Sequence, residues 1–391
     1  MRRILLTTLF SLFFGACYAQ DSSRLRISLL TCTPGDELYS IFGHSAIRIT
    51  DSTAMTDIVF NYGTFNFDDK NFYLKFARGK LDYFLSLEYF NDFRNLYQYT
   101  GRGITEQVLN LSAGEKIALQ RALLENAKEE NRYYKYDFFF DNCTTRLRDL
   151  ILKFKSPTPQ LPATMPSGTR FREAIHLYLD KGEQHWSKLG IDILLGARTD
   201  AVMKPGEQQF LPDNLMRALD GSINTKVVET KSELYEKPQI NFEPSLITPS
   251  GFFSGFMILM IFLSVYRSPK TKRWFQVIDS TLFFLTGLLG IVLVLMWTAT
   301  DHSMTKDNYN LLWAIPSHLF ISFFMHSGKN WVRLYFGITA VVMVLVLLAW
   351  FLLPQQMNNA LLPLVAVLML RSVAKYSEHG KQNHLGTWRA N

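Results

Sequence analysis

In the stretch Phe140-Asp141-Asn142-Cys143-Thr144, two residues that can cap a helix come directly before a cysteine. This combination determines the fold that we expect around it. Asp141 or Asn142 can cap a helix, because their short polar side chains accept hydrogen bonds from its first free N–H groups. The apolar face of that helix follows as Leu147, Leu150, Ile151 and Phe154. The sequence therefore predicts a helix that begins near Asn142 and carries Cys143 in its first turn.

A thiol in that position is suited to act as a nucleophile. Only the thiolate attacks, and a helix N-terminus lowers the pKa of a thiol. A second motif, Phe42-Gly43-His44-Ser45-Ala46, opens a predicted strand and offers His44 as general base. Backbone N–H groups at the start of the Cys143 helix can hold an oxyanion. The residues alone leave an alternative open at equal weight, which is a Cys32–Cys143 disulfide in an oxidising compartment.

Around these motifs the pattern is mixed α and β. Alternating apolar residues predict strands at residues 25–30, 45–49 and 56–62. The capping box Ser112-Ala113-Gly114-Glu115 predicts a helix that runs to about Arg132. Shorter helices are expected at residues 170–179 and 213–219. The fold class predicted for this part is α+β.

The N-terminus has the pattern of an export signal. Arg2 and Arg3 precede the short apolar run Ile4 to Phe14, and small residues up to Ala19 make cleavage there plausible. In an alternative interpretation, Cys17 is lipidated after Phe14-Gly15-Ala16, although Phe is a poor residue at the first of those positions. Both interpretations assign residues 1–20 to a signal peptide and export the chain from Asp21 onward.

The C-terminal third is expected to cross the membrane about five times. Apolar runs lie at residues 251–266, 279–298, 310–325, 332–353 and 359–374. Lys and Arg gather in the links after the first and third runs and in the tail, whereas the alternate links have few. This asymmetry places the C-terminus in the cytoplasm. The predicted domains are an exported domain at residues 21–245 and an all-α transmembrane domain at residues 246–391.

Charge and cysteine content exclude several classes of protein. The net charge of +7 would suit nucleic acid, but much of the excess lies between apolar segments near the C-terminus. No nucleic-acid partner is therefore expected. The three cysteines, Cys17, Cys32 and Cys143, are too few for a disulfide scaffold, and no CxxC or HExxH spacing occurs. No metal site and no cofactor are predicted.

Several motifs resemble one known family. The string Thr33-Pro34-Gly35-Asp36-Glu37-Leu38-Tyr39 with Phe42 to Arg48, and the later Asn61-Tyr62-Gly63 and Asp141-Asn142-Cys143-Thr144-Thr145, resemble the exported domain of the Lnb-type lipoprotein N-acyltransferases. Thr300-Asp301-His302 and Pro316-Ser317-His318 resemble the membrane part of that family. The resemblance implies a circularly permuted papain-like fold, in which the His strand precedes the Cys helix, followed by a bundle of about five transmembrane helices.

The resemblance also implies the roles of the site residues. Cys143 is the nucleophile, His44 the base, and Asn61 the third catalytic residue that orients the imidazole. Asp36, Glu37 and Asp141 are competitors for that third role. Substrate-binding roles are assigned to five further residues, namely Arg48, Asn142, Asp301, His302 and His318. For Arg48 an ordinary ion pair is the alternative, and for His318 it is a hydrogen bond between helices.

The function predicted is that of a membrane-bound cysteine acyltransferase. It takes an acyl chain from a membrane phospholipid and passes it to the N-terminal α-amine of a diacylated lipoprotein. The expected location is the inner membrane, with the catalytic domain in the periplasm. Two alternatives stay open: a membrane-anchored cysteine hydrolase, and a non-enzymatic binding protein with the Cys32–Cys143 disulfide. Fourteen of the forty residues from Phe60 to Tyr99 are Phe or Tyr, and some of these are expected to rest on the bilayer.

Overall fold

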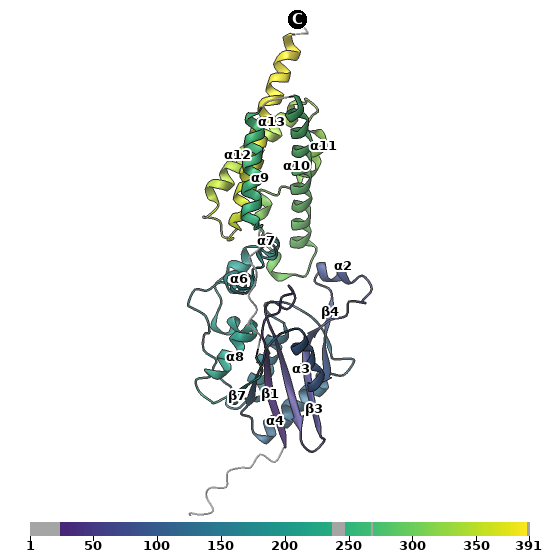
Figure 1. The fold of residues 1–391 in the computed structure, drawn as a ribbon, viewed down its shortest axis with the longest axis vertical. Helices are drawn as coiled ribbons and strands as arrows, with labels where there is room; N and C mark the ends of the chain where they lie inside the picture. Colours follow the sequence, from purple (N-terminus) through teal and green to yellow (C-terminus); the bar gives the residue numbers. More distant parts are fainter. Residues whose placement is uncertain (1–23, 237–246, 267–268, 389–391) are drawn as a thin grey trace, which may run out of the picture.

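The computed structural model describes residues 24–236, 247–266 and 269–388. The predicted signal peptide, with Cys17, lies outside the described residues. The chain forms a sheet domain and a bundle of long helices, stacked end to end in Figure 1. Strand β7 (Val228–Tyr235) ends the sheet domain, and helix α9 (Pro249–Val265) begins the bundle.

Seven described strands form one antiparallel sheet in the order β6-β4-β3-β2-β1-β5-β7. The predicted strands at residues 25–30, 45–49 and 56–62 are confirmed as the three neighbouring strands β1, β2 and β3 near the centre of the sheet. The bounds are β1 Leu25–Cys32, β2 His44–Asp51, β3 Thr56–Thr64, β4 Asp82–Tyr89, β5 Ile104–Leu109 and β6 Tyr133–Lys135.

Helices cover both faces of this sheet. On one face, α4 (Ala113–Asn126), α5 (Cys143–Phe154) and α8 (Pro212–Asp220) share a core with residues such as Leu29 and Ile47. On the other face, α3 (Phe90–Tyr99) packs against Ala46 and Val59. The two sets alternate along the central strands, so β1, β2 and β3 each contribute to both cores.

The predicted helices are present with adjusted ends. Ser112 and Glu115 form the predicted capping box of α4. That helix ends at Asn126 rather than near Arg132, because the side chain of Asn131 donates to the carbonyl of Glu125 and helps to close a turn there. The helices expected at residues 170–179 and 213–219 are found as α6 (Phe171–Lys181) and α8.

Helix α7 (His185–Leu194) lies between the sheet domain and the bundle in Figure 1, and the short turn η1 (Ala197–Asp200) follows it in the chain. The Asn308 side chain donates to the carbonyls of Ile193 and Leu194 at 2.8 and 3.1 Å. The N–H of Gly196 donates to the Met304 carbonyl at 2.9 Å. A Cβ on Gly196 would lie 1.9 Å from the Lys306 carbonyl oxygen, so this approach requires glycine.

A buried ion cluster fixes the same junction from inside. Arg172 on α6 pairs with Asp192 and Asp200, each at 2.9 Å, and all three side chains are buried. The second oxygen of Asp192 accepts a hydrogen bond from Asn358 of the bundle at 2.9 Å. Buried charges that are paired and hydrogen-bonded lock one arrangement, so the two domains have a defined relative position.

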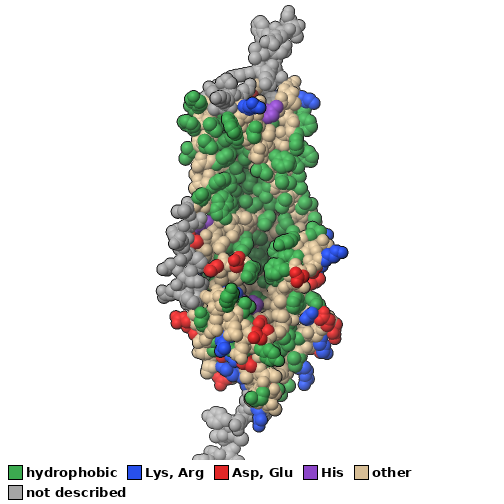
Figure 2. All heavy atoms as spheres, turned by 45° about the vertical axis from the view of Figure 1, so that its right-hand side comes forward, with side chains coloured by type: hydrophobic (Ala, Val, Ile, Leu, Met, Phe, Trp, Pro, Cys, Tyr) green, Lys and Arg blue, Asp and Glu red, His purple; other side chains and the backbone are tan. Residues whose placement is uncertain are grey.

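The bundle contains α9, α10 (Pro269–Thr298), α11 (Ser317–Phe324), α12 (Asn330–Ala349) and α13 (Leu362–Trp388). Among the described residues, three segments are long and apolar enough to cross a membrane: Arg273–Thr298, Asn330–Ala349 and Asn359–Glu378. Helix α9 is apolar but has only 17 residues. Figure 2 shows hydrophobic side chains over most of the bundle, acidic and basic ones over the sheet domain, and Lys, Arg and His side chains at the far end of the bundle.

The predicted count of five transmembrane helices is not confirmed. The third apolar run, residues 310–325, is not one continuous helix: the turn η4 (Tyr309–Leu312) and Pro316 leave α11 only eight residues long. Residues 314–326 run beside α10 in the opposite direction. Their backbone approaches Gly290 and Gly287, where added Cβ atoms would lie 2.1 and 1.9 Å from it. Proline cannot donate an N–H within a helix, which accounts for the break.

Candidate active site

Three side chains on neighbouring strands form a hydrogen-bonded chain. His44, the first residue of β2, has Nε2 3.1 Å from Oδ1 of Asn61 on β3. The Asn61 amide nitrogen donates to Oε1 of Glu88 on β4 at 2.5 Å. An ionised carboxylate can only accept, so the amide nitrogen faces Glu88 and the amide oxygen faces His44. The His44 hydrogen then lies on Nε2, and Nδ1 is the basic nitrogen of the neutral ring.

Cys143 is the first residue of α5, as the sequence predicts. Asn142 caps that helix: its Oδ1 accepts hydrogen bonds from the N–H groups of Thr144 and Thr145, both at 2.8 Å. The hydroxyl of Thr145 accepts in return from the Asn142 N–H at 2.8 Å. The helix start is therefore held rigidly, and it places the thiol where the helix dipole favours the thiolate.

The surroundings of Cys143 favour its ionised form. Burial alone would raise the pKa of the thiol, and the charge and hydrogen bond of His44 act against it. Further hydrogen bonds come from the Ser45 N–H and the Thr144 hydroxyl, and together they lower the pKa of Cys143 from 9.0 to about 7. For His44, burial opposes the charged form, whereas the Cys143 charge and hydrogen bonds to Cys143 and Asn61 raise its pKa. Each group thus favours the charge of the other.

Cys32 lies near the same groups but is chemically different. It pairs with His44 in the register of β1 and β2, and it is fully buried. Burial raises the pKa of Cys32 to about 12. Cys32 and Cys143 are both free thiols in the structure, so the disulfide on which the binding-protein alternative rests is not formed here.

Two glycines shape the backbone around the site. Gly43 has φ +81°, and a Cβ there would lie 2.8 Å from the Cys32 carbonyl oxygen. Gly63 has φ +90° and sits where the β3–β4 register shifts. A Cβ on Gly63 would lie 3.6 Å from the Cβ of Cys143 and 3.5 Å from the ring of Tyr136. Both positions adopt a left-handed conformation that disfavours other residues.

Glu88 was not among the predicted site residues. It is half-buried, and burial raises its pKa, while the nearby His44 charge and the Asn61 hydrogen bond oppose that shift. The only signal for Glu88 in the sequence was that it is an acidic residue in the segment that forms β4. Its relation to Asn61 depends on the pairing of β3 with β4, two strands separated by a loop of 17 residues from Phe65 to Leu81.

The competitors for the third role have other positions. Asp36 and Glu37 lie exposed in the loop between β1 and β2. Asp141 forms a two-point ion pair with Arg146, at 2.6 and 2.8 Å. In the structure, only Asn61 among the four candidates is hydrogen-bonded to the His44 ring.

Two of the predicted substrate-binding residues are engaged within the sheet domain. Arg48 binds Asp57 at 2.7 and 2.6 Å and Glu106 at 3.1 Å, and it stacks on the ring of Phe90. Arg48 lies four positions after His44 on β2, which is about 13 Å along the strand. Asn142, besides capping α5, donates through its Nδ2 to the carbonyls of Phe138 and Phe210. The structure does not bring Arg48 to Cys143. Both the oxygen and the nitrogen of the Asn142 amide are hydrogen-bonded to backbone groups of the protein.

Asp301 and His302 lie just beyond the end of α10, against the sheet domain. The Asp301 N–H donates to the Arg78 carbonyl at 3.0 Å, and the His302 ring lies 3.1 Å from the Phe76 carbonyl. The next residue, Ser303, donates to Asp137 at 2.7 Å. Because Asp137 pairs with Asp141 just before Cys143, this loop borders the segment that leads to the nucleophile.

His318 lies inside the bundle instead. Its Nδ1 is 2.6 Å from the Tyr335 hydroxyl, which is a hydrogen bond between α11 and α12. The backbone at His318 packs on Gly287, about 16 Å along α10 from Thr298. The structure therefore does not bring His318 together with Cys143.

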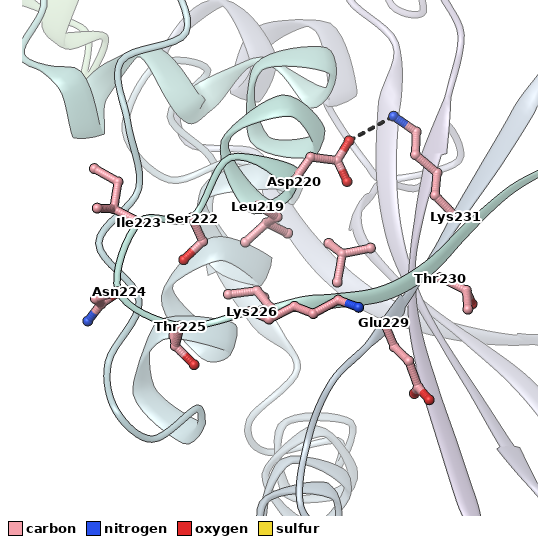
Figure 3. Close-up of a pocket in the computed structure, with 12 residues that line it drawn as sticks. Leu219, Asp220, Ser222, Ile223, Asn224, Thr225, Lys226, Glu229, Thr230 and Lys231 are labelled. Atoms are coloured by element: carbon pink, nitrogen blue, oxygen red, sulfur yellow. Dashed lines mark hydrogen bonds and ion pairs between the residues drawn. The ribbon is translucent and has the colours of Figure 1, made fainter.

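A pocket of about 480 Å³ lies elsewhere, between the end of α8 and β7 (Figure 3). Asp220 and Lys231 form an ion pair at its rim at 2.8 Å. Residues 219, 220 and 222–231 line this pocket, and none of them belongs to the site around Cys143. Among the described residues, no three His, Cys, Asp or Glu side chains come together to hold a metal ion.

The fold and the site define a class, that of a membrane-anchored protein whose α+β domain carries a Cys–His–Asn arrangement. Residues 18–170 match the model of the Lnb N-terminal periplasmic domain, and residues 241–383 match that of the Lnb transmembrane domain. The two matches together cover more than half of the chain, which belongs to the Lnb family. No curated protein and no solved structure gave a match. The protein is thus a membrane protein with a periplasmic domain, of a family associated with lipoprotein maturation.

Proposed function

We propose that this protein is a membrane-bound cysteine acyltransferase. It moves an acyl chain from a phospholipid, through a thioester on Cys143, to the N-terminal α-amine of diacylglyceryl-cysteine lipoproteins. The observation that carries the proposal is a thiol with its pKa lowered to about 7 beside His44, in a periplasmic domain of the Lnb family. Such a thiol is ionised enough to attack an ester at neutral pH.

In the first half of the reaction, the Cys143 sulfur attacks the ester carbonyl of the phospholipid, and His44 takes the thiol proton on Nδ1. The oxyanion is held by the N–H of Cys143, because Asn142 already engages the N–H groups of Thr144 and Thr145. When the tetrahedral intermediate collapses, the C–O bond breaks and His44 returns the proton to the leaving alkoxide. A lysophospholipid leaves, and the acyl chain remains on Cys143 as a thioester.

In the second half, the free α-amine of the lipoprotein attacks the thioester carbonyl. His44 accepts the proton that the amine loses, and the C–S bond breaks. The products are an amide on the lipoprotein and the Cys143–His44 pair in its starting charge state. No redox step occurs, and proton transfers balance within the pair.

The fold and topology complete the proposal. The order of a His strand before a Cys helix supports a circularly permuted papain-like domain. Five crossings of the inner membrane are made by α9, α10, the segment of α11, α12 and α13, with the C-terminus in the cytoplasm. Asp301 and His302 lie beneath the catalytic domain, where they meet the donor head group or the incoming amine.

The test is the state of a lipoprotein N-terminus. Mass spectrometry of a diacylated lipoprotein should show one added acyl chain, in an amide, only when the active protein is present. Cys143→Ala should give no transfer, whereas Cys32→Ala is a matched control that should retain most of it. Release of free fatty acid with the lipoprotein unchanged would refute transfer and favour the hydrolase.

A further inference from the structure

The loop between β3 and β4 carries an exposed apolar surface. We call residues 65–80, which include the short helix α2 (Phe72–Ala77), the α2 arm. Phe72 is buried against Phe65 and Phe67, with ring centroids 5.9 and 5.1 Å apart. Large apolar side chains of the arm nevertheless face outward, among them Tyr73, Leu74 and Phe76, which are 82%, 58% and 52% exposed. An apolar cluster of this kind on a short loop marks an interaction surface.

The position of the α2 arm is fixed relative to the membrane domain. Its backbone carbonyls at Phe76 and Arg78 accept hydrogen bonds from His302 and Asp301, which follow the end of α10. Gly79 packs so closely on this loop that an added Cβ would lie 3.2 Å from the His302 nitrogen. Figure 1 shows α2 beside the lower end of α10. The arm is therefore held at the level where the apolar segment Arg273–Thr298 ends.

Aromatic rings connect the arm to the nucleophile. Phe72 contacts Phe65, Phe65 lies 5.3 Å from Tyr83, and Tyr83 stacks on Tyr136 at 4.4 Å. The ring of Tyr136 and the Cβ of Cys143 both border the position that a Gly63 side chain would occupy. This row of rings offers an acyl chain a continuous apolar wall from the membrane side toward the thiol.

We propose that the α2 arm seats its exposed face in the lipid–water interface of the membrane that the bundle crosses, so that a phospholipid reaches Cys143 along the row of rings from Phe72 to Tyr136. Aromatic side chains with a polar tip are favoured at that depth, and tethering at both β-strand ends and at α10 prevents deeper insertion. The path to Cys143 rests on the proposed function, whereas the contact with lipid does not.

The contact is tested by fluorescence on the full chain in phospholipid vesicles. Tyr73→Cys, in the Cys143→Ala background, carries an environment-sensitive label, and the lipids carry a spin label near the top of the acyl chain. The Cys143→Ala protein without the Tyr73→Cys change, treated with the same label, gives the background fluorescence. Met55→Cys is the matched control, because Met55 is 87% exposed but lies in the β2–β3 turn, at the opposite end of β3 from the arm. We expect quenching at position 73 and none at position 55. Equal quenching at both positions, or none at 73, would overturn the inference.

The path is tested by two rates measured on the same preparation. One is acylation of Cys143 by vesicle phospholipid, and the other is alkylation of Cys143 by a small thiol reagent. The ratio of the first to the second should fall roughly tenfold in Tyr73→Asp/Leu74→Asp and stay unchanged in Met55→Asp. An unchanged ratio in the double variant contradicts the path.

The two proposals fail in different ways. If no phospholipid acylates wild-type Cys143 but the label at position 73 is quenched, the proposed function fails and the lipid contact stands. If Cys143 is acylated but position 73 is not quenched, the acyltransferase stands and the lipid contact is refuted.

Discussion

The side-chain amide of Asn61 donates to the carboxylate of Glu88 at 2.5 Å, and this contact decides which way the amide faces. Its oxygen is then directed to Nε2 of His44, 3.1 Å away. An asparagine free to flip would offer His44 either an acceptor or a donor. Glu88 therefore acts as a positioning residue, because through Asn61 it selects the ring tautomer that leaves Nδ1 basic.

Replacing Glu88 should consequently slow acylation without touching the reacting atoms. We expect Glu88→Ala to lower the acylation rate of Cys143 about tenfold, the equivalent of one hydrogen bond of roughly 1.4 kcal/mol. Glu88→Gln should recover most of the rate, because its amide oxygen still accepts from Asn61. The alkylation profile of Cys143 against pH should shift upward in Glu88→Ala. If Glu88→Ala lowers the stability of the protein but does not shift the pH profile of Cys143 alkylation, Glu88 has only a structural role.

Alkylation of Cys143 should depend on pH with a midpoint near 7. The pKa of Cys143 is lowered from 9.0 to about 7, so the thiolate and the alkylation rate should increase through that pH and level off above it. His44→Ala removes the stabilising charge, and the midpoint should move up. Cys32, with its pKa raised to about 12, should stay unlabelled over the same range. A wild-type midpoint near 9 would contradict this description of the site.

Substitution of glycine by alanine should destabilise the junction between the domains at Gly196 but not at Gly190. A Cβ at Gly196 would lie 1.9 Å from the Lys306 carbonyl, whereas nothing lies within 4 Å of one at Gly190. Gly196→Ala should destabilise the protein by about 3 kcal/mol. Gly190→Ala, in the exposed part of α7, should be neutral or stabilise by up to about 1 kcal/mol. Thermal unfolding of both purified variants in detergent measures this, and equal Tm values would refute a tight junction.

The central strands and the helix that starts at Cys143 could be predicted from the sequence itself, because local signals such as the Asn142 cap act over a few residues. The pairing of His44 with Cys143 and Asn61 was instead implied by the resemblance to a known family, since the residues alone left a Cys32–Cys143 disulfide open. Local signals were insufficient for the third apolar run. Its composition suits a spanning helix, yet Pro316 and the turn before it interrupt the helix.

Contacts between distant segments could not be predicted in the same way. Glu88 is placed beside Asn61 only by the register of β3 and β4. For Arg48 the sequence left both substrate binding and an ion pair open, and its partners Asp57 and Glu106 come from other strands. Gly196 is buried against Lys306 only when the bundle is present. Such relations depend on tertiary pairing, which a single sequence does not encode locally.

The orientation in the membrane should place Asp301 and Ser377 on opposite sides. Asp301 is exposed beyond the end of α10 at Thr298, and Ser377 is exposed in α13, at the end of the apolar segment Asn359–Glu378. Both cysteine variants are made in the Cys143→Ala background, because Cys143 itself reacts with thiol reagents. In intact cells a membrane-impermeant thiol reagent should label Asp301→Cys from the periplasm. Ser377→Cys should react only after the membrane is permeabilised. Labelling of Ser377→Cys in intact cells would reverse the assigned topology.

The account is tested most directly by trapping the acyl-enzyme. Purified protein mixed with a phospholipid labelled in its acyl chain, without any acceptor, should accumulate one labelled peptide that contains Cys143. Neutral hydroxylamine should release the label, as expected for a thioester, and Cys143→Ala should never acquire it. His44→Ala should acquire it roughly 10²–10⁴-fold more slowly. Label on any other residue, or full transfer by Cys143→Ala, would contradict the central claim that Cys143 carries the acyl chain.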